Sequence, residues 1–172
     1  MPPRCQTGKA NARVHALRFV PTEDHTALRQ ATMSSNGYAV FTNLAQASLT
    51  LPEGLKAYAL QAGEIDANTV SLQPATVIGK GEAVLLKGVA NETYTMTLDN
   101  TQESDVPVEN YLAPVLAWQK PLANNTETGN AQYVFDGGQF NMADGKTKVL
   151  KGEAILSVPA DDDMTTFTMS SL

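Results

Sequence analysis

The chain has 172 residues and a formal net charge of −6, and only 17% of its residues are charged and 6% aromatic. This length suits one domain that buries a core of its own. The single cysteine, Cys5, excludes an internal disulfide. No apolar run reaches the roughly 18 residues of a membrane-spanning helix, and no apolar stretch near the N-terminus predicts a signal peptide.

Charge is distributed unevenly along the chain. Residues 1–32 contain five basic and two acidic residues, whereas the remainder contains seven lysines and sixteen acidic residues. We expect residues 1–30 to be a flexible stub, a linker or the end of an upstream module, and residues 31–172 to form a single β-domain. Every arginine lies at or before Arg29. Because the planar fork of arginine is favoured for phosphate or carboxylate recognition, we expect no nucleic-acid binding.

In chain order, the first half of the sequence predicts short strands separated by turn residues. A short helix is expected over 22–29, and the Ser-Ser-Asn-Gly sequence at 34–37 predicts a turn. Pro74 is expected to end the last strand of this half. The expected strands cover residues 13–20, 38–41, 49–51, 55–61 and 69–72.

The same pattern continues in the second half, and no long amphipathic helix interrupts it. Asp136-Gly137-Gly138 is a strong hairpin signal, and Asp144-Gly145 predicts a further turn. The expected strands cover residues 83–86, 94–98, 132–135 and 139–142. Short strands with closely spaced turns predict an all-β fold, either a β-sandwich or a small barrel.

The sequence also contains an internal repeat. Residues 80–86 (KGEAVLL) recur 71 positions later at 151–157 (KGEAILS), and residues 94–97 (YTMT) recur at 167–170 (FTMS). The two copies cover approximately 77–98 and 148–170. They predict two pseudo-repeated strand-turn-strand halves, with the two Gly-Glu-Ala strands in equivalent places about a pseudo-two-fold axis.

The glycines of the repeat are its most informative residues. Gly81 and Gly152 each precede an apolar run and predict a bend that requires positive φ or a close backbone approach. The apolar runs that follow are typical of strands covered on both faces. Glu82 and Glu153 recur as a pair that suggests paired-carboxylate chemistry, but equivalent positions in a repeat more often place such residues on the solvent side of equivalent turns.

Several segments resemble, in order and spacing, a C-terminal β-module. They are residues 37–41 (GYAVF), 51–58 (LPEGLKAY), 81–88 (GEAVLLKG), 133–135 (YVF) and 154–160 (AILSVPA). Over residues 31–172 the chain resembles the module that recurs in secreted and cell-surface proteins, including glycoside hydrolases, of Bacteroides- and Prevotella-like gut and rumen bacteria. The resemblance implies a secreted or cell-surface accessory module that acts as a spacer, display or terminal domain beside an upstream domain of the same parent protein.

The distribution of reactive side chains argues against an enzyme. His15, His25 and Cys5 all precede the expected domain, so it can hold neither a catalytic triad nor a Cys–His pair. We therefore expect no catalysis, no cofactor and no metal site. Calcium binding by the carboxylates of 161–163 (DDD) stays open, although consecutive carboxylates point in different directions and favour a solvated turn.

Carbohydrate binding is the alternative function, with a polysaccharide as partner. Exposed aromatic rings can stack on sugar rings, and Trp118, Tyr111 and Tyr58 are the candidate residues. A single tryptophan in a β-domain is, however, more often a core or rim residue. A fimbrial or adhesin-like subunit is the second alternative, which strand exchange between copies would reveal.

Overall fold

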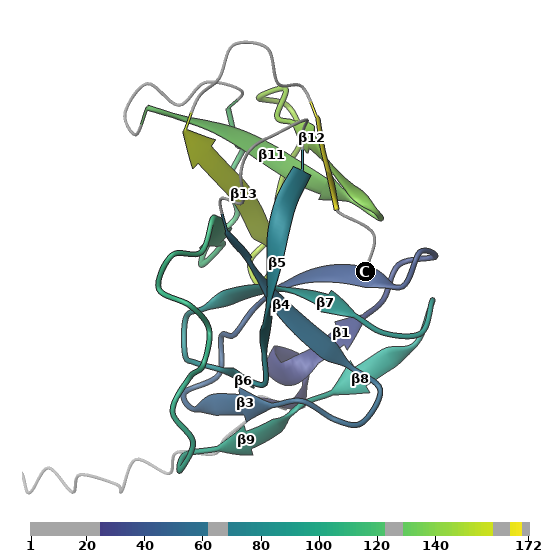
Figure 1. Cartoon of the computed structure of the whole chain (residues 1–172), viewed down its shortest axis with the longest axis vertical. Coiled ribbons are helices and arrows are strands. Elements are labelled where there is room, and N and C mark those ends of the chain that lie inside the picture. The colour runs from purple at the N-terminus through teal and green to yellow at the C-terminus, as the bar shows by residue number, and fades with distance from the viewer. Residues whose placement is uncertain (1–24, 62–68, 123–128, 160–165, 170–172) are drawn as a thin grey trace, which may run out of the picture.

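The computed structural model describes residues 25–61, 69–122, 129–159 and 166–169 and is almost entirely β, as predicted (Figure 1). One 3-10 helix, η1 (His25–Arg29), stands where the short helix was expected. The predicted strand 13–20 and the acidic run 161–163 lie outside the described residues. The strands are β1 (Gln30–Thr32), β2 (Tyr38–Thr42), β3 (Ser48–Thr50), β4 (Lys56–Gln61), β5 (Thr69–Ala75), β6 (Val77–Ile78), β7 (Ala83–Lys87), β8 (Thr93–Thr95), β9 (Thr97–Asp99), β10 (Leu112–Pro114), β11 (Asn130–Asp136), β12 (Gln139–Met142), β13 (Ala154–Pro159) and β14 (Thr166–Met169).

The largest sheet has nine strands, and the four strands at each end are arranged in the same pattern of chain order. It runs β10-β13-β11-β12-β14-β5-β4-β7-β2, and smaller sheets have the orders β6-β3-β9 and β1-β8. On each side of β14, four antiparallel strands make an equivalent group: β2-β7-β4-β5 in the first half and β10-β13-β11-β12 in the second. The sheet is open at β10 and β2, so the fold is sandwich-like and not a closed barrel.

The duplication is therefore larger than the repeat that the sequence shows. The strands β7 and β13, which follow the repeated glycines, occupy equivalent places one strand from each end of the sheet, as predicted. Their neighbours correspond as well, although β2 and β10, or β4 and β11, share little sequence. Strand residues need only be apolar on the buried face, so this part of the duplication leaves little trace in the sequence.

The repeated glycines occupy the same turn in both halves. Gly81 has φ of +78° and Gly152 has φ of +95°, which is the left-handed conformation that the third residue of a type II turn requires. In both turns the amide of the glutamate, Glu82 or Glu153, donates to the carbonyl three residues earlier at 3.2 Å. The glutamate carboxylate then accepts a 2.7 Å hydrogen bond from the amide of that earlier residue.

Buried side chains on β7 and β13 alternate between two faces. Ala83 and Leu85 of β7, and Ala154, Leu156 and Val158 of β13, join one core cluster between the two halves. The opposite face of β7 packs into a second cluster of eleven buried residues, which the two small sheets cover. The corresponding face of β13 contributes only Ile155 to a cluster with three. The outer side of the second half is thus thinly covered.

Two polar side chains join the halves at their junction. Thr42, at the end of β2, donates its hydroxyl to the Glu153 carbonyl at 2.5 Å, and its amide donates to Gly152 at 2.7 Å. Asn110 accepts hydrogen bonds from the amides of Leu60 and Leu112 and donates to the Ala83 carbonyl at 2.7 Å. These bonds fix the second half against β2, β4 and β7.

Three expectations are corrected. The second matching elements of the repeat are not equivalent, because β8 pairs with β1 whereas β14 pairs with β12 and β5. The domain begins before residue 31, since Gln30 starts β1 and the amide of Met96 donates to the Arg29 carbonyl. Strand β5 continues through Pro74, which lies on a stretch paired with β4 alone among the described strands, where proline is tolerated.

Candidate ligand-binding surface

Two loop segments cross the thinly covered outer side of the second half. Residues 115–122 follow β10 and residues 143–150 follow β12, and one antiparallel bridge joins them. In that bridge Gln119 and Val149 exchange two backbone hydrogen bonds, of 3.1 and 2.9 Å. Val149 is buried against Ile155. Because neighbouring residues on paired segments point to opposite sides, the flanking residues Trp118 and Leu150 point outward.

Trp118 is the exposed aromatic residue of this surface. Its side chain is 60% exposed, and that of Leu150, across the bridge, is 53% exposed. The Lys148 ammonium lies 4.7 Å from the Trp118 ring centroid, a cation–π contact between diagonal positions of the bridge. The contact orders the indole ring while leaving most of it open to solvent. We define the Trp118 face as Trp118, Lys120, Lys148 and Leu150.

The three predicted sugar-binding aromatic residues do not form one platform. Tyr58 is only 7% exposed and lies within β4, between Leu85 and Pro74 on the neighbouring strands. The prediction of an exposed ring at Tyr58 is wrong, because both faces of β4 are buried. Tyr111 is half-buried and packs against the core cluster between the halves. Of the three residues, Trp118 presents an exposed ring.

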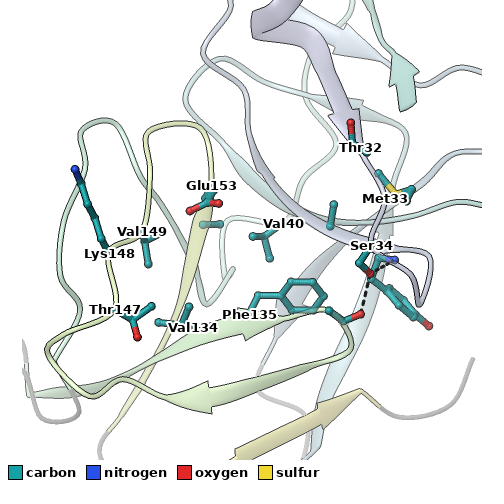
Figure 2. Close-up of a pocket in the computed structure, with 14 residues that line it drawn as sticks. Thr32, Met33, Ser34, Val40, Val134, Phe135, Thr147, Lys148, Val149 and Glu153 are labelled. Atoms are coloured by element: carbon teal, nitrogen blue, oxygen red, sulfur yellow. Dashed lines mark hydrogen bonds between the residues drawn. The ribbon is translucent and has the colours of Figure 1, made fainter. Parts of the chain in front are cut away.

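A cavity of about 430 Å³ lies where β1 and β2 face β11 and the turn before β13. Figure 2 shows Glu153 and Val149 on one side and Val40 on the other, with Ser34 and Thr32 at the opposite end from Lys148. An adjoining cavity of about 300 Å³ shares Thr32, Val40 and Glu153. No sequence motif marks this groove, because its walls come from segments more than ninety residues apart.

The two repeated glutamates stabilise the turns in which they lie. Glu82 also accepts a hydrogen bond from the Ser104 hydroxyl, and both carboxylates are held by the amide that opens their own turn. Both side chains are half-buried, so they are less exposed than the solvent-side positions expected. Each carboxylate thereby stabilises a strand entrance, which accounts for its recurrence without paired acid–base chemistry.

Within the described parts of the chain, no cluster of three or more histidine, cysteine, aspartate or glutamate side chains could hold a metal ion. The acidic run 161–163, where calcium was left open, lies outside those parts. Over the same ranges, no helix has the length and apolar character needed to cross a membrane.

Comparisons with protein-family models, with curated proteins and with solved structures found no match to this chain. The resemblance to a bacterial C-terminal module therefore stays a prediction, and the geometry described above carries the functional argument.

Proposed function

We propose that this chain is a non-catalytic accessory β-module of a larger secreted or cell-surface protein. The observation that supports this is the use of the repeated residues. Two matching turns, built by Gly81, Gly152, Glu82 and Glu153, start two buried strands. A duplicated segment whose residues stabilise the fold is typical of a spacer or display domain, which holds the neighbouring domains at a defined geometry.

The proposal is tested with the full chain and a panel of chromogenic glycosides and polysaccharides. We expect no release of product from any of them. The variants Glu82→Gln and Glu153→Gln should lower the free energy of unfolding, since each carboxylate accepts a hydrogen bond from an amide of its own turn. Hydrolysis by the wild-type chain that disappears in either variant, while the variant stays folded by circular dichroism, would overturn the proposal.

Carbohydrate binding is the second candidate, and the exposure of Trp118 favours it. The Trp118 ring is 60% exposed, and contact of a large apolar ring with water is less favourable than its burial. Stacking against a ligand removes part of this surface from water and is therefore favourable. Affinity electrophoresis in gels that contain neutral and acidic polysaccharides tests this candidate. Retardation of the wild-type chain that is lost in Trp118→Ala would support it, and identical mobility in every gel would exclude it.

A further inference from the structure

The Trp118 face is locally positive on an acidic protein. The two loop segments that carry this face, residues 115–122 and 143–150, contain three lysines and one acidic residue, Asp144, whose carboxylate accepts hydrogen bonds from the Lys146 and Thr147 amides. Residues 33–172 as a whole contain seven lysines and sixteen acidic residues. The Lys148 ammonium lies over the Trp118 ring and Lys120 is two residues beyond it, so two of these lysines adjoin the one tryptophan. A local group of positive charges on an acidic protein favours an anionic partner.

The bridge geometry places two of these lysines opposite each other. In the register of the Gln119–Val149 pair, Lys120 faces Lys148 and Trp118 faces Leu150. Like charges directly across an antiparallel pair repel each other. An anion bound between the two ammonium groups removes this repulsion. The face thus combines an ordered aromatic ring with two adjacent cationic groups.

The residue types on this face indicate the class of anionic partner. The planar guanidinium of arginine pairs bidentately with phosphate and with carboxylate, and the chain has no arginine after Arg29. Lysine instead provides a compact point charge that pairs with a single anionic oxygen. A flat indole ring beside it suits a pyranose ring, whose apolar face stacks on aromatic side chains. Sugars that carry carboxylates satisfy both requirements.

We propose that the Trp118 face binds acidic polysaccharides, that is, polymers of uronic acids. A pyranose ring stacks on the exposed face of Trp118, and carboxylates of the same or adjacent sugars pair with Lys120 and Lys148. This inference rests on the proposed carbohydrate binding and specifies its ligand class. The contact of the Lys148 ammonium with the indole at 4.7 Å holds charge and ring together before ligand arrives.

The test uses isothermal titration of the full chain with three polymers. Polygalacturonate has both the sugar ring and the charge, its methyl ester keeps the ring without the charge, and polyglutamate has carboxylates without sugars. We expect binding to polygalacturonate alone, weakened by added salt because exposed charges are screened. Trp118→Ala should weaken binding about tenfold or more, and Lys120→Gln by about threefold to tenfold.

Lys56→Gln is the matched control, because Lys56 is an exposed lysine on β4 in the other half and should leave the affinity unchanged. Equal binding of polygalacturonate and its methyl ester would overturn the inference while leaving carbohydrate binding intact. Equal binding of polyglutamate would overturn it as well, by showing a general polyanion site. Absence of binding to all three polymers would contradict both the inference and carbohydrate binding.

Discussion

Two polar residues at the end of β2, Thr42 and Asn43, are almost completely buried. The Asn43 amide group donates to the carbonyls of Ala47 and Ile78, and its oxygen accepts from the Ala45 amide. Its backbone groups also pair with the turn at Gly81. A buried side chain with every partner in place stabilises one arrangement and penalises others. Asn43 therefore determines how the chain leaves β2.

Gly81 and Gly152 are expected to be intolerant of alanine for a conformational reason. A Cβ at Gly81 would meet no atom within 4 Å, so its cost comes from the φ of +78° and not from a clash. Left-handed backbone costs a residue with a Cβ about 1–2 kcal/mol. We predict that Gly81→Ala and Gly152→Ala each lower the free energy of unfolding by about this amount, measured by urea titration.

Gly81→Asn is the control for that measurement, because asparagine tolerates the left-handed region better than other residues with a side chain. Its loss of stability should be smaller than that of Gly81→Ala. If the two substitutions are equally destabilising, the positive φ is not the reason that glycine occurs at this turn.

We predict that Asp105 makes the free energy of unfolding depend on pH in the acidic range. Burial raises the pKa of its carboxyl, but hydrogen bonds from the Thr76 hydroxyl and the amides of Val77 and Thr76 outweigh this effect and hold the pKa below its ordinary 3.8. A lowered folded-state pKa contributes stability that is present above about pH 4 and is lost as pH falls through the folded-state pKa. The Asp105→Asn variant should lack this contribution.

The measurement compares the urea unfolding of wild type and Asp105→Asn between about pH 7 and pH 3. The stability difference between them should be largest near neutral pH and shrink below about pH 4. Thr76→Val, which removes one donor, should show a smaller change in the same direction. A difference that stays constant over this range would show that the Asp105 carboxyl does not carry the effect.

At the scale of elements, β2 connects the halves through its last residue. The Thr42 hydroxyl donates to the Glu153 carbonyl across the junction. Thr42→Val keeps the shape but removes this donor, while the Glu153 carbonyl keeps its 3.1 Å hydrogen bond from the Val115 amide. We predict a loss of about 0.5–1.5 kcal/mol in the free energy of unfolding, the usual contribution of one hydrogen bond. Thr50→Val is the control, because the Thr50 hydroxyl makes a longer, 3.4 Å bond at an exposed site and should cost less than about 0.5 kcal/mol.

The strand elements also explain which predictions succeeded. Strands β2, β7, β11 and β12 lie where alternation, apolar runs and turn glycines placed them, and the Asp136-Gly137-Gly138 hairpin joins β11 to β12 as expected. The predicted strand over 94–98 is instead divided at Met96 into β8 and β9, which pair with β1 and β3. A local pattern cannot indicate this division, because the partners come from more than forty residues away.

At the scale of the whole molecule, the shared core predicts cooperative unfolding. The main cluster draws Leu60, Ala83 and Leu85 from the first half and Tyr133, Phe140 and Leu156 from the second. Neither half can bury these side chains alone, so we expect both to unfold in one transition. Amide hydrogen exchange of β7 and β13 should therefore report the same free energy of opening, whereas the short β1–β8 pair should exchange faster. Exchange from β13 at a clearly lower free energy than from β7 would show that the second half opens independently.

The candidate surface shows the same division between local and tertiary information. Trp118 could be named from the sequence because it is the sole tryptophan, but Tyr58 could not be excluded. One face of β4 is buried by the second half of its own sheet and the other by the cluster under the two small sheets, and neither contact is visible in the sequence. Lys120 and Lys148 are 28 positions apart and become neighbours only through the Gln119–Val149 bridge. That these two lysines are neighbours could be recognised only from the register of the two loops.

The sequence by itself determined the all-β class, the two repeated glycine turns and the buried strands that follow them, because these features depend on backbone conformation and on local alternation of apolar residues. Only the tertiary structure revealed that the duplication extends over four strands in each half, that the repeated glutamates hold their own turns, and that the outer side of the second half is thinly covered. These features depend on which distant segments pair, and such pairings are decided by packing of the whole chain.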